Sequence, residues 1–313
     1  MMRIWVTGGA GFLGSHICDR LLAEGHQVDA LDDLSSGDLA NLAEARRHDD
    51  FSFHQIDVRR PELIELARRH RPDAVIHAVG FLERPGSIHA PREDTEVNLG
   101  ALLRVLATAR AVECRRVVAV VHATPEADTA PATPAEVNAW TAIDHLRIHH
   151  EQAWIETAAA VVANVYGPRQ MVDDQGPLVA RMARQVTRGE PCVIHGDGLQ
   201  TRDLVFVDDA VSAVVSCLEA PSGSVVPIGS GSTSTPLDVL GLIETALGRS
   251  VDVLHEPARV PDPDRPAWPI DTAHALLGWA PWTDLEDGVG EVLAEWRTRV
   301  VEAPAADDVA PPV

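Results

Sequence analysis

The sequence predicts an α/β protein built on a Rossmann-type, doubly wound parallel sheet, with a smaller C-terminal α/β substrate lobe. Short apolar runs alternate with amphipathic stretches through the first half of the chain. A glycine-rich turn follows the first run directly, and two acidic residues close the second run. After about residue 167 the elements shorten, and glycine and proline become more frequent. These observations together predict the fold class.

The predicted strands are short apolar runs, and the predicted helices carry apolar residues three and four positions apart. Because strands and helices alternate, the strands are expected to lie parallel, with helices on both faces of the sheet. The expected strands are Arg3–Thr7, Gln27–Leu31, Phe51–Ile56, Ala74–His77, Val117–Val121 and Val161–Val165. The expected helices are Phe12–Glu24, Pro61–His70, Ser87–Ala111 and Glu136–Ala159.

The 313 residues provide ample length for a buried core. We place the larger domain at residues 1–167, with further core segments after residue 200, and the substrate lobe mainly at residues 168–300. Residues 301–313 are rich in alanine, proline and aspartate, without periodicity, and are expected to form a disordered tail.

Composition limits the classes of partner and compartment. A formal net charge of −21 argues against nucleic acid and anionic membranes and favours a small-molecule ligand. The four cysteines are scattered without a C-x-x-C motif, and no secretory signal is visible, so we expect a cytoplasmic protein. No apolar run approaches the roughly 20 residues that span a bilayer.

The chain contains no lysine, and Tyr166 is its only tyrosine.

The turn after the first strand has the pattern G-x-x-G-x-x-G at Gly8, Gly11 and Gly14. Glycines there permit a tight turn and let backbone N–H groups, including those of Phe12 and Leu13, approach a pyrophosphate at the helix N-terminus.

Acidic residues after the second strand specify the nucleotide. Asp32 and Asp33 can accept hydrogen bonds from an adenosine ribose and would repel the 2′-phosphate of NADP, so we predict NAD as the cofactor. The remaining candidate cofactor contacts follow later strands or neighbouring loops: Ser35, Ser36, Gly37, Asp57, Val58, Ala78, Val79, Gly80 and Asn98.

From residue 3 to about residue 290 the sequence resembles the extended short-chain dehydrogenase/reductases of the nucleotide-sugar epimerase and dehydratase family. The resemblance implies NAD, an NDP-sugar-like ligand, and a homodimer formed through the segments 87–111 and 136–159. The motifs that carry it, besides Asn98, are TGGAGFLGSH, LDDLSSG, VIHAVG, NVYGPRQ, GDGLQTRDLVFVDDA and DTAHALLGW.

The catalytic pair of this family is missing. The family's Y-x-x-x-K motif supplies a tyrosine base and a lysine that lowers its pKa, but here Trp140 and Asp144 occupy the two positions. An indole cannot act as a base near neutral pH, and a carboxylate reverses the charge that would stabilise a phenolate. The Asp-Glu pair of the dehydratases is also absent, which argues against 4,6-dehydration.

Three residues are candidates for replacement chemistry. His122 is a general acid/base or a hydrogen-bonded histidine at a strand end, and Thr124 retains a substrate contact. Asp144 is a base if its helix face lines the cleft and a solvated residue if the helix is rotated. His145, His149 and His150 lack a third ligand at a recognisable spacing, so we assign no metal site.

Substrate contacts are expected from both halves of the chain. Glu83 and Arg84 follow the fourth strand, and the resemblance places Asn164 and Arg202 against sugar and diphosphate. The family's second phosphate arginine is expected around Asp264–Trp268, where Arg265 is displaced.

Three functions remain open at this point. The first is an NAD-dependent epimerase-like isomerase of a nucleotide-sugar that uses a non-standard acid/base. The second is a catalytically silent homologue that binds the same ligands and regulates a partner. The third is a non-redox isomerase or cyclase in which NAD is structural.

Overall fold

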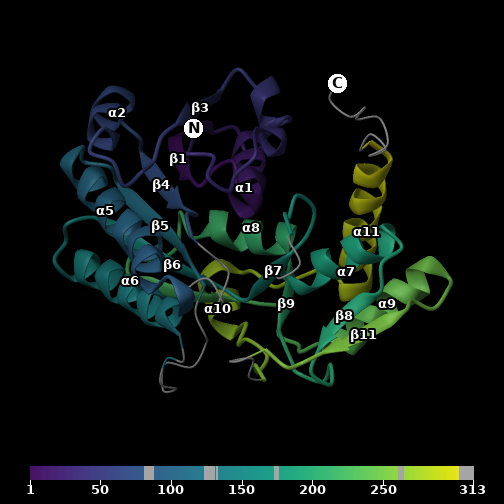
Figure 1. Ribbon diagram of the computed structural model, residues 1–313. Helices are drawn as coiled ribbons and strands as arrows, with labels where there is room; N and C mark the ends of the chain where they lie inside the picture. The colour runs from purple at the N-terminus through teal and green to yellow at the C-terminus, as the bar shows by residue number, and fades with distance from the viewer. Residues whose placement is uncertain (81–87, 123–130, 132, 173–175, 260–263, 303–313) are drawn as a thin grey trace. The chain divides into compact units, whose positions relative to one another are not determined.

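The computed structural model describes residues 1–80, 88–122, 131, 133–172, 176–259 and 264–302. The chain divides into two compact units, which are described separately (Figure 1). Unit 1 comprises Met1–Val165, Asp203–Thr233 and Pro266–Trp282, so the chain returns to it twice. Unit 2 comprises Tyr166–Arg202, Ser234–Arg265 and Thr283–Val313.

Unit 1 is built on a parallel sheet, which confirms the predicted fold class. Among the described residues, seven strands pair in the order β10-β6-β5-β4-β1-β2-β3. Each pairing is parallel, and Val6 of β1 lies opposite Ala30 of β2 and Ile76 of β4. Strands covered on both faces are rich in apolar residues, as β4 and β5 are here. The strands are β1 Arg3–Thr7, β2 Gln27–Asp32, β3 Phe51–Gln55, β4 Ala74–His77, β5 Arg116–Val121, β6 Glu156–Val162 and β10 Ser224–Ile228.

Helices cover both faces of this sheet. Figure 1 shows α2, α5 and α6 on one face and α1 and α8 on the other. Helix α6 packs on β5 and β6, and α8 packs against α1 and β6. The helices of unit 1 are α1 Phe12–Ala23, α2 Leu63–His70, α4 Pro91–Asp94, α5 Ala101–Ala111, α6 Pro134–Glu151, α8 Val207–Ser216 and α10 Asp271–Leu277, with short 3-10 turns at Leu39–Leu42 and Ala45–Arg47.

The expected helix Glu136–Ala159 and the expected strand Val161–Val165 were wrong in their bounds. Helix α6 ends at Glu151, close to Ala153, which has a positive φ of 52°. The following alanines belong to β6, because they are buried between β5 and β10 in the sheet. Alanine has a high helix propensity, and here tertiary packing overrides it. Residues Asn164–Tyr166 form the separate strand β7, which pairs with β9 Leu204–Phe206.

The expected helix Ser87–Ala111 is interrupted. Between α4 and α5, residues Thr95–Gly100 form a π-helical turn, a rare conformation that is common at functional sites. The turn contains Asn98, a predicted cofactor contact.

Unit 2 is smaller and has its own helices and strands. Helix α11 packs on α7 and α9, and a two-stranded parallel pair, β8 with β11, completes the unit. Its elements are α7 Leu178–Thr187, β8 Cys192–His195, α9 Pro236–Leu247, β11 Val253–Glu256 and α11 Leu285–Glu302.

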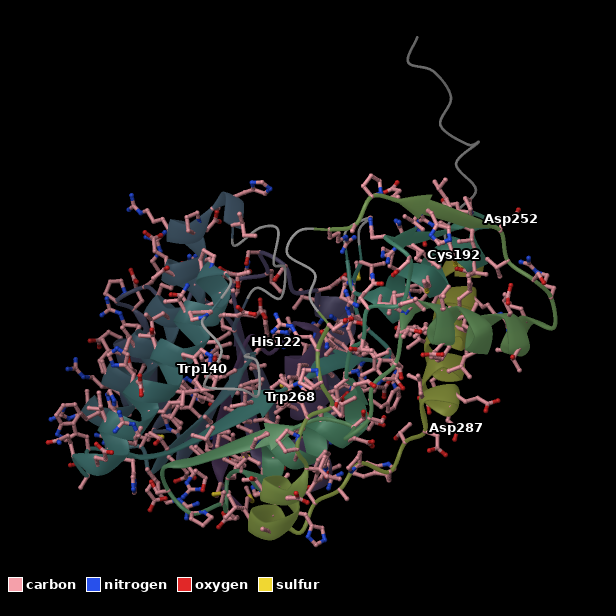
Figure 2. The ribbon with its side chains drawn as sticks, turned by 90° about the horizontal axis from the view of Figure 1, so that it is seen from below. His122, Trp140, Cys192, Asp252, Trp268 and Asp287 are labelled. Carbon is pink, nitrogen blue, oxygen red and sulfur yellow. The ribbon has the colours of Figure 1, made fainter. Side chains whose placement is uncertain are left out.

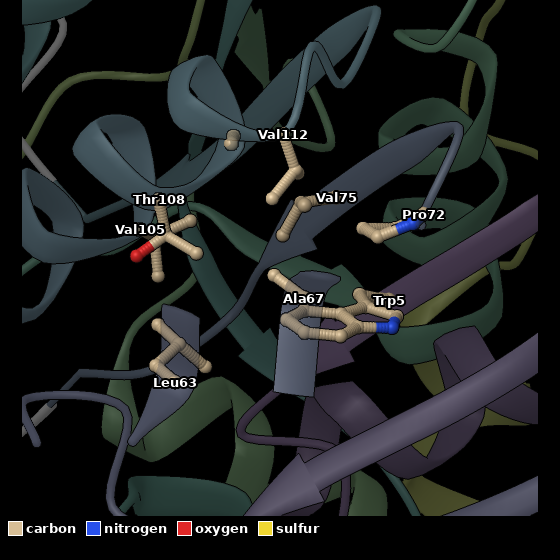
Figure 3. Close-up of a pocket in the computed structure, with 9 residues that line it drawn as sticks. Trp5, Leu63, Ala67, Pro72, Val75, Val105, Thr108 and Val112 are labelled. Carbon is tan, nitrogen blue, oxygen red and sulfur yellow. The ribbon is translucent and has the colours of Figure 1, made fainter. Parts of the chain in front are cut away.

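A small apolar cavity of about 10 Å³ lies in the core of unit 1, between the sheet and helices α2 and α5. Figure 3 shows Trp5 of β1 beside Ala67 of α2 at this cavity, with Val105 and Val112 among the other lining residues. Such a volume corresponds to about one water molecule, so the cavity is a packing defect and not a ligand site.

Within the described chain, no helix is both long enough and apolar enough to cross a membrane.

Candidate functional site

The predicted cofactor residues of unit 1 gather at one edge of the sheet. They follow β1, β2, β3 and β4, which are adjacent in the order β4-β1-β2-β3. Because these strands are parallel, the loops after them meet at the carboxyl edge. The reversal of strand order at β1 and β4 marks the crevice in which such sheets bind ligands.

The glycine-rich turn is shaped so that side chains cannot be added. Gly8 has a φ of +72°, and a Cβ there would lie 2.7 Å from the carbonyl oxygen of Ala78. A Cβ on Gly14 would overlap the carbonyl oxygen of Gly8. The N-cap of α1 is Gly11, and no side chain caps this end of the helix. The first N–H groups of α1 therefore remain available to an anion.

Asp32 supports this turn from the end of β2. Its carboxylate accepts hydrogen bonds from the backbone N–H of Ala10 at 2.9 Å and of Leu34 at 2.8 Å. Burial raises the pKa of Asp32 despite these hydrogen bonds. Gly37 lies against it, because a Cβ there would be 2.9 Å from Oδ1 of Asp32. Asp32 thus joins the glycine-rich turn to the loop that follows β2.

A charged group lies beside the loop that follows β2. It consists of Asp33, Asp57 and Arg59. The guanidinium of Arg59 donates two hydrogen bonds to Asp57, at 2.8 and 3.0 Å, and lies 3.9 Å from the carboxylate of Asp33. Partial burial opposes ionisation of Asp57, but the hydrogen bonds and charge of Arg59 outweigh it and lower its pKa. Asp33 is the more exposed of the two carboxylates after β2, with its side chain 31% accessible, so it is the better placed to meet a ribose.

Asn98 belongs to a hydrogen-bonded cluster at the end of β4. A Cβ on Gly80 would lie 3.0 Å from Oδ1 of Asn98. The amide of Asn98 donates to the buried carboxylate of Asp94 at 2.8 Å, and Asn138 of α6 donates to the same carboxylate at 2.6 Å. These contacts fix α6 relative to the helical segment that carries Asn98.

His77, the last residue of β4, is buried directly before Ala78. Its Nδ1 lies 2.7 Å from the hydroxyl of Thr7, and its Nε2 is buried without a hydrogen-bond partner among the described residues. Burial lowers the pKa of His77 to about 4. The imidazole is therefore neutral at pH 7.

A pH-dependent loss of stability follows from His77. Below the unfolded value of 6.5, the unfolded chain binds a proton that the folded chain excludes until about pH 4. This histidine is thus expected to remove about 3 kcal/mol from the free energy of unfolding as the pH falls from 6.5 to 4. Urea unfolding of His77→Asn across this range should show a shallower loss. The matched substitution His48→Asn, at an exposed histidine, should keep the wild-type slope, and an unchanged slope in His77→Asn would contradict the assignment.

Helix α6 carries Trp140 and Asp144, the residues expected at the positions of the family's catalytic pair. Trp140 is partly buried, whereas Asp144 is exposed and forms an ion pair with Arg147 at 3.2 Å (Figure 2 labels Trp140). Arg147 also pairs with Glu151 at 2.8 Å, so Asp144 takes part in a row of charges along an exposed helix surface.

His122 directly follows β5, the strand on which α6 packs (Figure 2). Its imidazole is partly buried, with Nδ1 shielded from solvent. Of the other candidates near this strand end, Thr124, Glu83 and Arg84 lie outside the described residues.

Unit 2 contains a convergence of positive charge that sequence analysis identified only in part. Arg181 of α7 is 3% exposed, and its Nε is buried without a hydrogen-bond partner among the described residues. Burial, followed by the charges of Arg259 and Arg202, lowers the pKa of Arg181 to about 10. The pKa of His195 is lowered too, first by the burial of its own side chain and then by the charges of Arg259 and Arg181. Such a group of cations is suited to a multiply charged anion.

Arg202 was predicted, but Arg181 and Arg259 were missed. The sequence predicts the second phosphate arginine around Asp264–Trp268, and Arg259 lies five residues before that segment. A loop longer by a few residues would align Arg259 with the expected position. No pattern in the sequence marks Arg181, because it lies on a helix otherwise defined by its buried apolar face.

Asn164 begins β7 in unit 1. Its side-chain amide donates to the carbonyl oxygen of Asp203 at 3.0 Å. Asp203 is fully buried and its carboxylate accepts hydrogen bonds from the backbone N–H groups of Ser230, Gly231 and Trp268. Asn164 is therefore held by Asp203, a fully buried residue whose carboxylate is itself hydrogen-bonded.

Known proteins are similar to this chain over most of its length. Residues 4–229 match the model of the NAD dependent epimerase/dehydratase family. A UDP-glucose 4-epimerase of Mycolicibacterium smegmatis is 32% identical over 311 residues, covering 95% of this chain and 99% of that protein.

Solved structures show the same fold. A UDP-glucose 4-epimerase of Thermotoga maritima, solved with UDP-glucose, aligns with a TM-score of 0.89 at 27% identity, covering 96% of this chain and 100% of that one. A UDP-glucose 4-epimerase of Thermus thermophilus in complex with NAD aligns with a TM-score of 0.85 at 28% identity, covering 95% and 99%.

Proposed function

This chain belongs to the NAD dependent epimerase/dehydratase family, and we propose that it binds NAD and a UDP-sugar and isomerises the sugar with a non-standard acid/base. The observation that carries the proposal is the glycine-rich turn, which is shaped for a pyrophosphate although the family's catalytic pair is absent. When bound, NAD supplies a hydride acceptor. The chain's own residues must then bind both ligands, orient the sugar and move its hydroxyl proton.

The turn fits NAD for a steric and an electrostatic reason. Gly8 and Gly14 leave no room for a Cβ, so the backbone itself forms the surface that a pyrophosphate would meet. The uncapped N-terminus of α1 adds favourable partial charge. Asp33 would receive the ribose, and its negative charge supports NAD over NADP. Asp57, Val58, Ala78, Val79, Gly80 and Asn98, together with the loop residues Ser35, Ser36 and Gly37, would line the remaining cofactor surface.

The arginines of unit 2 would hold the diphosphate of the UDP-sugar. Arg181, Arg202 and Arg259 concentrate positive charge in a chain whose net charge is −21, and a diphosphate would compensate it. Asn164 remains our candidate for a sugar contact.

The substitution Arg259→Gln tests this assignment. Arg259 influences Arg181 electrostatically and is only partly buried, so its loss should leave the fold intact. UDP affinity, measured by titration calorimetry, is expected to fall about tenfold, the effect of losing one charge-assisted contact. The control Arg249→Gln, at an exposed arginine that these contacts do not include, should bind UDP like the wild type. Equal affinity in all three proteins would contradict the diphosphate assignment.

His122 is our preferred acid/base because it follows β5, the strand that supports α6, and because imidazole titrates near working pH. Purified protein would be incubated with a panel of UDP-sugars, and epimers would be separated by chromatography. His122→Ala is expected to lower turnover by about 10²–10⁴-fold, whereas Asp144→Ala should change it less than about threefold, because Asp144 is paired with Arg147 on an exposed surface. Full activity of His122→Ala would remove His122 from the mechanism.

A catalytically silent binding protein is the second candidate, favoured by the simultaneous replacement of both catalytic residues by Trp140 and Asp144. Binding of NAD and UDP without turnover of any tested sugar would support it. A third candidate, isomerisation or cyclisation with structural NAD, would show turnover without transient NADH absorbance.

We also propose a homodimer and a cytoplasmic location. Val137 and Ile148 of α6 are 48% and 39% exposed, which supports α6 as part of a subunit contact. Light scattering that gave a monomeric mass at micromolar concentration would contradict the dimer. The four cysteines are buried and none of them is in a disulfide, in keeping with a reducing compartment.

A further inference from the structure

Three side chains with metal-binding groups meet in unit 1, away from the glycine-rich turn. Asp29 lies on β2, His54 on the edge strand β3, and His70 is the last residue of α2. One ligand atom of each lies within 4.8 Å of the other two. Asp29 lies three residues before Asp32, the last residue of β2, a span of about 10 Å along the strand, so this group is separate from the cofactor edge.

The distances within this group suit one metal ion. Nε2 of His54 is 3.6 Å from Oδ1 of Asp29, and Nδ1 of His70 is 3.4 Å from Oδ2. Ligand atoms bound to zinc at 2.0–2.1 Å in a tetrahedron are about 3.3–3.4 Å apart. The observed separations are near that value, and Nε2 of His54 is shielded from solvent.

The carboxylate is prepared as a ligand. The indole N–H of Trp5 donates to Oδ2 of Asp29 at 3.0 Å, as outer-shell donors do at metal sites.

Arg3 provides the positive charge in the metal-free arrangement. Its Nη1 lies 3.4 Å from Nδ1 of His70 and 3.7 Å from Oδ2 of Asp29. A guanidinium can only donate, so Nδ1 of His70 accepts from it, and the lone pair of that nitrogen faces the position that Arg3 holds. Because the Arg3 side chain is 36% exposed and also donates to Gln27, it can leave without losing every partner.

We propose that Asp29, His54 and His70 form a binding site for a divalent transition metal of the zinc class, with Arg3 as the competing cation. The ion would join the edge strand β3 and the end of α2 to β2. Its role would be to stabilise unit 1, independently of the catalytic chemistry. The ligands are 25 and 16 residues apart, so no short sequence motif reveals them.

The test is equilibrium dialysis of the full chain, free of any histidine tag, against Zn²⁺, followed by elemental analysis of the protein. One high-affinity zinc per chain is expected. Removal of an outer-shell partner typically costs 10- to 100-fold, so His54→Ala and His70→Ala should each weaken zinc binding by at least about 100-fold. Arg3→Gln should strengthen it about tenfold, because a repelling charge is removed.

A matched control removes two histidines elsewhere. The double variant His145→Ala/His149→Ala, on α6, should bind zinc like the wild type. Thermal unfolding with and without Zn²⁺ provides a second readout: zinc should raise the Tm of wild type and control but not that of His70→Ala. No stoichiometric zinc in the wild type, or binding unaffected by both His54→Ala and His70→Ala, would overturn the proposal.

Discussion

Restoring the missing phenol and ammonium is expected to accelerate sugar epimerisation by about 10²–10⁴-fold. The double variant Trp140→Tyr/Asp144→Lys would place a tyrosine one helical turn before a lysine on α6, where the lysine can lower the pKa of the phenol. The measurement is conversion of UDP-glucose to its C4 epimer at saturating NAD. UDP-glucose is chosen because the Mycolicibacterium relative is a UDP-glucose 4-epimerase.

The fold should tolerate this change. Trp140 is only partly buried, and Asp144 loses one exposed ion pair with Arg147, which contributes little to stability. The control is Trp140→Phe/Asp144→Lys, which retains the ring and the new cation but lacks the hydroxyl. If the tyrosine variant were no faster than this control, the absent phenol would not be what limits epimerisation.

Closing the glycine-rich turn is expected to abolish NAD binding. In Gly8→Ala the new Cβ would lie 2.7 Å from the carbonyl oxygen of Ala78 and 3.1 Å from the nitrogen of Val79, so the end of β4 must shift. Rearranging the backbone at the pyrophosphate site should weaken NAD by more than about 100-fold, a cost of roughly 3 kcal/mol. Fluorescence titration with NADH and calorimetry with NAD would measure this loss.

Gly25 offers a matched control for the same substitution. Its φ of +80° resembles that of Gly8, but a Cβ there meets nothing within 4 Å. Gly25→Ala should therefore cost only the backbone strain of about 1–2 kcal/mol in stability and leave NAD affinity unchanged. If both variants bound NAD equally well, close approach at Gly8 would not be needed for the cofactor.

Local sequence patterns predicted β1 and β4 because those strands are short and mostly apolar. Arg3–Thr7 and Ala74–His77 have the predicted bounds, and the glycine spacing between β1 and α1 is set by nearest neighbours in the chain. The segment after Glu151 was misread because alanines favour a helix locally, whereas burial between β5 and β10 makes them a strand. Propensity acts on neighbours in sequence, and sheet pairing does not.

The sequence by itself determined the fold class, the glycine-rich turn with its acidic partner at the end of β2, and the absence of any lysine from the chain. Tertiary structure alone decided three further matters: that Asp144 pairs with Arg147 on an exposed surface, that Arg181 and Arg259 act on one another, and that Asp29, His54 and His70 meet. The reason is physical. Turn geometry and residue identity are local properties, whereas charge interactions and ligand groups depend on distances between segments that only folding brings together.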